Sequence, residues 1–127
     1  MAGRLDITAL ADPGGIRAVG EVDVVTSTPW ELALDAVRDG SGDTVIDLAG
    51  LAFIDVGGLR ALAVTAFSVS SQGRRLILRG AASSVRRFLD LLGWSELFVF
   101  EQCRSLRHGR PESSPLEAGV ASADRAA

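Results

Sequence analysis

Three aspartates stand where side chains often do chemistry in an α/β protein. Asp23, Asp47 and Asp55 each come near the end of a segment with a strand-like pattern. Paired carboxylates can exchange protons with a substrate or hold Mg²⁺. A simpler interpretation is also available: Asp55 caps the helix that follows it, and Asp47 bonds to loop backbone.

The residues that these chemistries would need as partners are missing. All thirteen basic residues are arginine, so neither a Walker-type phosphate loop nor the lysine of a receiver domain is present. The single histidine, His108, and the single cysteine, Cys103, lie in or beside a polar C-terminal segment. One imidazole and one thiol do not make a zinc site or an oriented nucleophile. The sequence therefore predicts no enzyme, no metal and no cofactor.

Composition indicates one globular domain. The chain has 127 residues, of which 47% are hydrophobic and 23% are charged. The net charge of −3 gives no reason to expect nucleic acid as a partner. A lone cysteine suits a reducing compartment, and no signal peptide or long apolar run is evident. We expect a cytoplasmic protein without membrane insertion.

The first part of the chain predicts a hairpin and a helix. Residues 5–10 and 16–22 alternate like strands around a turn at residues 12–15. Thr28 and Glu31 have the spacing of a capping box, with Pro29 at the first helical position. The predicted helix runs to about Arg38 and buries the face that carries Trp30.

The central stretch, residues 44–71, predicts a strand, a turn and a helix in immediate succession. Residues 44–48 suit a buried strand, and Asp55-Val56-Gly57-Gly58 suits a turn at a helix N-terminus, where unpaired N–H groups gather. The helix is expected to bury one face, made of Leu59, Leu62, Ala63, Ala66 and Phe67.

The remaining segments complete an α/β pattern. Residues 75–79 and 97–100 predict strands on either side of a helix that Ser83 or Ser84 caps and Gly93 ends. The apolar face of this helix is expected to hold Val85, Phe88, Leu89 and Leu92. The order β-β-α-β-α-β-α-β predicts a mixed sheet with its helices on one face. Residues 1–103 form the predicted domain, and residues 104–127 are predicted to be a disordered tail.

Together these segments resemble the STAS family, and within it the anti-sigma factor antagonists. The resemblance rests on Gly20-Glu21-Val22-Asp23, on Val45-Ile46-Asp47-Leu48, and on Leu51-Ala52-Phe53-Ile54-Asp55 with Gly58-Leu59. It continues through Leu76-Ile77-Leu78 and Val85 to Gly93, and so spans roughly residues 5–101. It implies a bacterial protein-binding module for a partner-switching pathway in transcription regulation.

The resemblance also implies a switch that this chain lacks. In such antagonists an anti-sigma factor that is also a serine kinase, of the GHKL type, phosphorylates a serine in the turn. Here the equivalent position is Val56, which has no hydroxyl, and Gly57 follows it. Neither serine nor threonine occurs between Thr44 and Thr65, and Thr65 lies too far along the helix to replace the missing group. The turn is therefore expected to be non-phosphorylatable.

Three functions fit this pattern. The chain could be an antagonist held in its binding-competent form, a STAS scaffold subunit of another complex such as a lipid-transport ATPase, or a decoy component of a partner switch. The sequence leaves the oligomeric state open. The expected partner-binding residues are those of the turn and the helix face next to it, with one aspartate nearby: Asp23, Asp55, Val56, Gly57, Gly58, Arg60, Ala61 and Val64.

Overall fold

The computed structural model describes residues 4–11 and 14–102 and confirms the predicted order of elements. The hairpin strands are β1 (Leu5–Ala11) and β2 (Gly14–Val22). The alternating part consists of α1 (Ser27–Asp39), β3 (Thr44–Ile54), α2 (Val56–Ser71), β4 (Leu76–Arg79), α3 (Ser83–Leu92), the short 3₁₀ helix η1 (Ser95–Leu97) and β5 (Val99–Glu101). The predicted tail, Cys103 and His108 lie outside the described residues.

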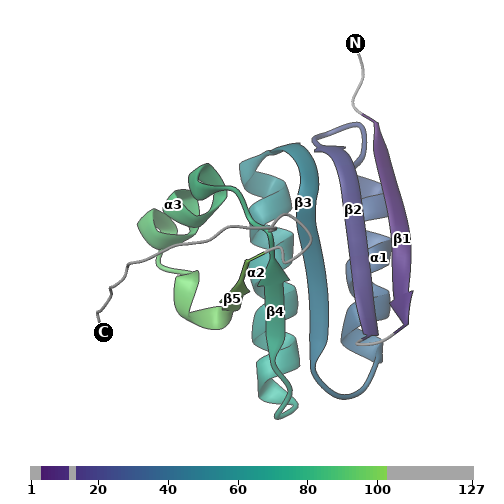
Figure 1. Ribbon diagram of the computed structural model, residues 1–127, viewed down its shortest axis with the longest axis vertical. Coiled ribbons are helices and arrows are strands. Elements are labelled where there is room, and N and C mark those ends of the chain that lie inside the picture. The colour runs from purple at the N-terminus through teal and green to yellow at the C-terminus, as the bar shows by residue number, and fades with distance from the viewer. Residues whose placement is uncertain (1–3, 12–13, 103–127) are drawn as a thin grey trace, which may run out of the picture.

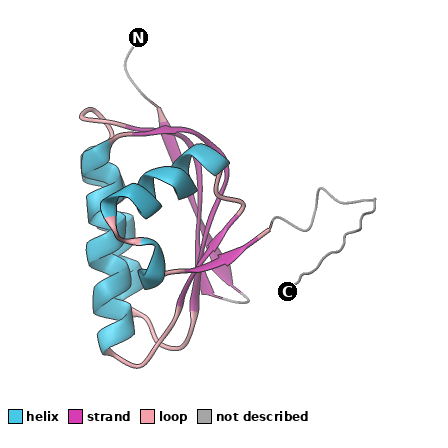
Figure 2. Cartoon of the chain, turned by 90° about the vertical axis from the view of Figure 1, so that its left-hand side faces the viewer, coloured by secondary structure: helices cyan, strands magenta, loops and turns pink. Residues whose placement is uncertain are grey.

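The five strands form one mixed sheet in the order β1-β2-β3-β4-β5 (Figure 1). β1 is antiparallel to β2, and every other neighbouring pair is parallel. Parallel neighbours need a crossover, and each crossover here contains a helix. α1 and α2 lie behind the sheet in Figure 1, and the edge-on view in Figure 2 shows the helices on the same side of it. This confirms the predicted α/β class with the helices on one face.

The hydrophobic core lies between the sheet and this helical layer. The strands contribute Ile16, Ile46 and Leu78, and α1 contributes Trp30, as the apolar pattern of its sequence predicts. All four side chains are buried, and burial of such side chains stabilises the fold by about 1.5–3 kcal/mol each. One face of the sheet is thus covered by α1 and α2. Because β2 and β3 are parallel and pair as far as Val22 and Ile54, their C-terminal ends lie side by side.

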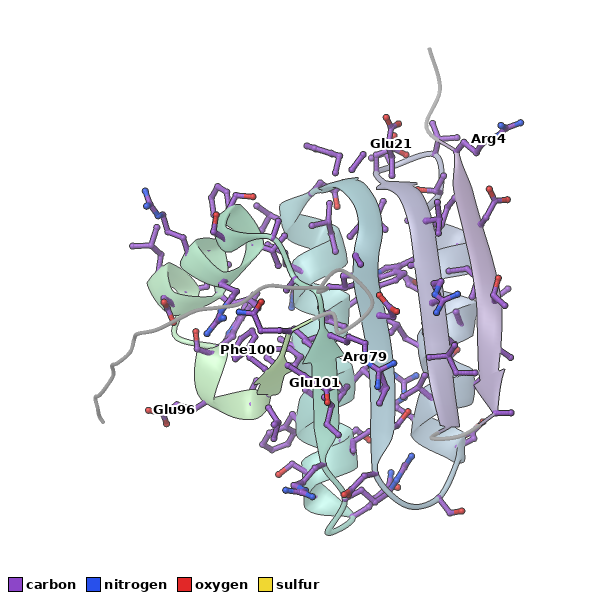
Figure 3. The ribbon with its side chains drawn as sticks, in the orientation of Figure 1. Arg4, Glu21, Arg79, Glu96, Phe100 and Glu101 are labelled. Carbon is purple, nitrogen blue, oxygen red and sulfur yellow. The ribbon has the colours of Figure 1, made fainter. Side chains whose placement is uncertain are left out.

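On the face of the sheet opposite the helices, charged side chains of neighbouring strands lie side by side. Asp47 lies opposite Arg17 of β2 and Arg79 of β4 in the strand register. Its carboxylate meets Arg17 Nε at 3.4 Å and accepts a hydrogen bond of 2.9 Å from the N–H of Ala49. Arg79 pairs with Glu101 of β5 at 2.9 Å (Figure 3). The sequence predicted that Asp47 lies near the end of a strand and bonds to loop backbone. Because β3 continues to Ile54, Asp47 instead lies inside the strand, and Ala49, its backbone partner, is in the strand too.

The start of α1 differs from the predicted capping box. The helix begins at Ser27, its N-cap is Thr26, and no side chain bonds to the free N–H groups of the first turn. Thr28 and Glu31 are therefore inside the helix. The Thr26 hydroxyl does not cap the helix because it is used on the other side, where it donates to the carbonyl oxygen of Glu21 in β2 at 2.8 Å.

The apolar face of α2 is also rotated from the predicted one. Leu59, Leu62, Ala63 and Ala66 are buried as expected, but Phe67 is 64% exposed and lies on the same side as Arg60 and Val64. Thr65 and Val69 are buried instead. The helix packs on α1 as well as on β4, so its buried face extends toward α1 and leaves Phe67 outside.

Helix α3 is buried less than its pattern predicts. Leu89 is its one fully buried residue, whereas Phe88 and Leu92 are exposed by 51% and 40%. Its N-cap is Ala82, which has no side-chain cap, so neither Ser83 nor Ser84 caps it. Gly93 ends the helix in the left-handed conformation, with φ of 78°, as predicted.

Arg74 fastens the end of α1 to the segment before β4. Its guanidinium donates to the carbonyl oxygens of Val37 and Arg38, both at 3.0 Å, and its Nε donates to that of Gly42 at 2.7 Å. Carbonyls in the last turn of a helix lack helical partners, and a cation there also interacts favourably with the helix dipole. The Arg74 side chain thus holds the C-terminal end of α1 against the segment before β4.

Candidate functional site

The predicted turn, Asp55 to Gly58, forms the N-cap and the first three residues of α2, directly after β3, and is held by hydrogen bonds. We refer to these four residues as the docking turn. Asp55 is the N-cap, and its Oδ1 accepts a hydrogen bond of 2.7 Å from the N–H of Gly58. The N–H of Asp55 donates to the carbonyl oxygen of Val22 at 3.0 Å, which ties the turn to the end of β2. The capping role expected of Asp55 is confirmed.

The two glycines of the turn have different surroundings. A Cβ atom on Gly58 would lie 2.6 Å from Cγ1 of Val22 and 2.8 Å from Cγ1 of Ile54, so no side chain fits there. A Cβ atom on Gly57 would meet only Asp55 Oδ1, at 3.6 Å. Gly58 is therefore required by close packing, whereas Gly57 leaves its position open.

Buried Trp30 supports the turn from behind. Its indole Nε1–H donates a hydrogen bond of 3.1 Å to the carbonyl oxygen of Gly58. The side chain is fully buried in α1, so the bond crosses between the two helices in the interior. Tryptophan is well suited to this position because it fills a large volume and carries one donor.

The outer side of the turn is apolar and uncharged. Val56 is 58% exposed, and Gly57 beside it is exposed as well. Further along α2 the exposed side carries Arg60, Val64 and Phe67, of which Val64 is 53% exposed. The structure thus brings Val56, Arg60 and Val64 onto one accessible face, as the sequence predicts.

Asp23 lies near the turn, but its carboxylate is used within its own loop. Oδ1 of Asp23 accepts hydrogen bonds from the N–H groups of Val25, at 2.9 Å, and Thr26, at 3.1 Å. The N–H of Asp23 in turn donates to the Thr26 hydroxyl at 2.9 Å. This closed set of bonds turns two side chains outward: Val24 is 83% exposed and Val25 is 61% exposed.

A groove between α1 and α2 opens beside the docking turn. It has a volume of about 460 Å³, and we call it the α1–α2 groove. The α2 wall contains four of the predicted residues, Gly57, Arg60, Ala61 and Val64, and the α1 wall contains Glu31, Leu34, Asp35 and Arg38, with Thr65 at the base. Arg38 pairs with Asp35 and donates to the Thr65 hydroxyl at 3.5 Å. The α1 wall was missed, because no local pattern shows which helix packs beside α2.

A second hollow lies on the other side of the turn, toward α3. It has a volume of about 150 Å³, and we call it the α3 cleft. Its lining is apolar except for one hydroxyl: Leu51, Ala52, Phe53, Ile54, Leu59, Ala82, Ser84, Val85 and Phe88. Sequence reasoning missed it because the expected burial of Phe88 left no free surface there.

The described surface around the docking turn offers apolar contact area and not a group of residues for metal binding or catalysis. Among residues 4–11 and 14–102 no group of three His, Cys, Asp or Glu side chains could hold a metal ion. The described part of the chain contains neither an imidazole nor a thiol. What the structure presents is an exposed apolar tip between a groove with charged walls and an apolar cleft.

Comparison with known proteins identifies the family. The family model described as "Mlab, STAS domain" matches residues 6–100, which is most of the chain and nearly all of its described part. The chain belongs to the STAS domain family. The predicted resemblance is thereby confirmed, and the docking turn lies in the middle of the matched STAS domain.

Solved structures show what this STAS domain is similar to. An anti-sigma factor antagonist from Mycobacterium paratuberculosis is 28% identical, with a TM-score of 0.60 over 79% of this chain and 86% of the other. A putative antagonist from Thermotoga maritima has a TM-score of 0.62 at 16% identity, over 80% of this chain and 88% of the other. Phosphorylated SpoIIAA of Bacillus has 0.57 at 16% identity, over 78% and 90%. The latter two comparisons support the fold alone.

A search of curated proteins finds no match to the sequence. Within the described residues, none of the helices has both the length and the apolar character needed to cross a membrane.

Proposed function

We propose that this STAS domain is a non-enzymatic binding module of the anti-sigma factor antagonist type. Its partner would be an anti-sigma factor that is also a serine kinase of the GHKL type, bound through the docking turn and the adjoining face of α2. The observation that carries the proposal is the docking turn itself, which is rigidly bonded inside and exposed and apolar outside. The 28% identity to an anti-sigma factor antagonist supports the same class of partner.

The docking turn carries no hydroxyl to which a phosphate could be attached. Residue 56 is valine, and the next hydroxyl along α2, that of Thr65, is fully buried and donates to the carbonyl oxygen of Ala61 at 2.9 Å. A phosphate would add about −1.5 to −2 charges to the contact surface. Without an acceptor at residue 56, binding by this face would be controlled by the amount of protein or by the partner, and not by modification of the turn.

Contact at this turn would depend chiefly on apolar burial. Three exposed valines, Val24, Val25 and Val56, follow the ends of β2 and β3. The hydrogen bond from the N–H of Asp55 to the carbonyl oxygen of Val22 keeps these two strand ends adjacent. Burial of apolar surface contributes about 25 cal/mol per Å² and depends little on salt, unlike ion pairs at the rim. Arg60 would add specificity at the edge of the contact.

A second candidate function is a STAS scaffold subunit of another complex, such as a lipid-transport ATPase. The apolar α3 cleft favours it, because permanent interfaces between subunits are more hydrophobic than transient ones. Both candidates use the same end of the domain, so they differ in the partner and not in the surface.

Binding measurements with purified partners test the proposal. The full chain should bind at least one anti-sigma serine kinase from the same genome, in calorimetry or biolayer interferometry, and mass spectrometry after incubation with ATP should find no phosphate on residues 53–60. Val56→Arg should weaken binding at least tenfold, which corresponds to about 1.4 kcal/mol. Leu32→Arg, at an α1 position outside both hollows, is the matched control.

The companion variant is Val56→Ser. It should accept a phosphate from the bound kinase and lose affinity once modified, because the new charge lies in the contact surface. If no kinase binds the wild-type chain while a transport ATPase does, the scaffold function replaces the proposed one. If Val56→Arg and Leu32→Arg bind a kinase equally well, the docking turn is not the binding site.

A further inference from the structure

We infer that the α3 cleft is an anchor pocket for one aromatic side chain of the protein that docks on the turn. The inference rests on the proposed function, since it assigns to the same partner a second point of contact. The partner must then present a phenylalanine-like ring in addition to the group that covers Val56.

The size of the cleft suits one ring. Its volume is about 150 Å³. An apolar protein cavity of about 150 Å³ is large enough for benzene, whereas pockets for drug-sized ligands have about 300–1,000 Å³. A single side chain therefore fills it, and a nucleotide or other cofactor does not fit.

The lining of the cleft selects an apolar occupant. Apart from the Ser84 hydroxyl every lining side chain is apolar, and none is charged. A charged group placed here would lose hydration without gaining a charged side chain as its partner. The α1–α2 groove, with Glu31, Asp35, Arg38 and Arg60 in its walls, differs sharply in this respect.

Two of the phenylalanines that line the cleft are about half exposed to solvent. Phe53 at the end of β3 is 53% exposed and Phe88 of α3 is 51% exposed, and both line the cleft. Leu91, further along α3, is 75% exposed. Pockets in which an aromatic anchor becomes fully desolvated supply most of the affinity in many interfaces.

The cleft is continuous with the docking turn. Phe53 and Ile54 directly precede Asp55, and Leu59 directly follows Gly58, so one strand–turn–helix segment carries both features. The cleft and the α1–α2 groove thus flank the first turn of α2 on its two sides. Because residues on both sides of the docking turn line the cleft, we assign the cleft to the protein that docks on the turn.

A small probe tests the pocket without the partner. N-acetyl-phenylalaninamide is titrated into the full chain, and methyl NMR shifts of Leu51, Leu59 and Val85 are followed. We expect saturable shifts with a dissociation constant on the order of 1 mM. Phe88→Ala, which removes a wall, and Ser84→Leu, which fills the space, should abolish them, whereas Leu91→Ala should not. N-acetyl-alaninamide should cause no shifts. Shifts spread over the surface, or equal in all variants, would overturn the inference.

The kinase that binds in the preceding experiment supplies the second arm. Phe88→Ala should weaken its binding at least tenfold, while Leu91→Ala, which alters the same helix outside the cleft, leaves it unchanged. If Val56→Arg disrupts the complex and Phe88→Ala does not, the cleft is not part of the interface, although the proposed function stands. If no kinase binds but the probe still enters the cleft, the proposed function fails and the pocket remains. Light scattering that shows self-association abolished by Phe88→Ala would assign the cleft to a second copy and overturn the inference.

Discussion

The indole Nε1–H of Trp30 lies 3.1 Å from the carbonyl oxygen of Gly58 and donates to it. The bond joins the first turn of α1 to the first turn of α2 inside the core. It therefore fixes how far apart the two helices stand at the docking turn, and with that the mouth of the α1–α2 groove. Variants of Trp30, Asp55, Gly57 and Gly58 test how this end of the domain is held.

Trp30→Phe should lower the free energy of unfolding by about 1–3 kcal/mol. The ring of phenylalanine is smaller and has no donor, so the variant loses a hydrogen bond and leaves part of a buried volume empty. Urea unfolding followed by circular dichroism measures the change. Leu32→Ala, at an exposed position of the same helix, should stay within about 0.5 kcal/mol. Equal stability of the two variants would mean that the bond does not hold the turn.

Gly58→Ala and Gly57→Ala should have opposite effects. At Gly58 the new methyl group meets Val22 and Ile54 at under 3 Å, so overpacking should cost about 1–3 kcal/mol. At Gly57 the space is open, and alanine should stabilise the helix by about 0.4–1 kcal/mol through the unfolded state. Thermal unfolding of the pair gives the signs directly. A neutral result at Gly58 would show that α2 can shift away from β2 at no cost.

Asp55→Ala should destabilise the domain by about 0.5–2 kcal/mol, because the N–H of Gly58 loses its acceptor at the N-cap. Asp55→Asn keeps an acceptor oxygen and should recover most of the loss. Denaturant unfolding of the three proteins separates the hydrogen bond from the negative charge. A loss in Asp55→Asn as large as that in Asp55→Ala would assign the effect to the charge at the helix N-terminus.

Arg74→Met should destabilise the domain by about 1–2 kcal/mol, with the effect centred on the C-terminal end of α1. The variant keeps an apolar stem but removes the donors to the carbonyl oxygens of Val37, Arg38 and Gly42. Arg74→Lys should recover only part of this, because one ammonium group cannot reach all three oxygens. Hydrogen exchange of amides near the end of α1 is the specific measurement. Full recovery in Arg74→Lys would mean that the positive charge alone suffices.

The ion pair between Asp43 and Arg75 should make a small contribution to stability that disappears in acid. The backbone N–H of Arg75, and then its guanidinium, hold the pKa of Asp43 below its usual value. A carboxyl whose pKa is lower in the folded state stabilises the fold above its unfolded pKa, about 3.9, and this contribution is lost as the pH falls through the folded pKa. Asp43→Asn should therefore be less stable than wild type at pH 7, with a gap that narrows below about pH 4. A gap independent of pH would exclude the carboxylate as its source.

Local sequence patterns predicted most of the fold and the exposure of several residues of the candidate site. The alternation in residues 16–22, the Asp55 cap and the Gly93 helix end depend on neighbours in sequence, and the structure contains all three. Val56, Arg60 and Val64 were correctly expected on an exposed face, because a turn at a helix N-terminus orients the residues that follow it.

The errors arise where another element decides burial. Phe67 fits an apolar period that starts at Leu59, but α2 packs against both β4 and α1, and this rotates its buried face toward Thr65 and Val69. Phe88 fits an amphipathic helix too, yet α3 lies beside the sheet edge and buries only Leu89 fully. The two hollows beside the turn are formed by elements distant in sequence, so spacing within one segment cannot reveal them.

Gly58 is closely packed, whereas Val56 and Gly57, the two residues before it, are exposed. Residues 56 and 57 face open space, so a substitution there changes the exposed surface with little effect on the stability of the fold. Residue 58 faces the interior, where any added atom must displace a neighbour. Under the proposed function, one substitution at residue 56 or 57 would change which partner the domain binds while the domain stays folded.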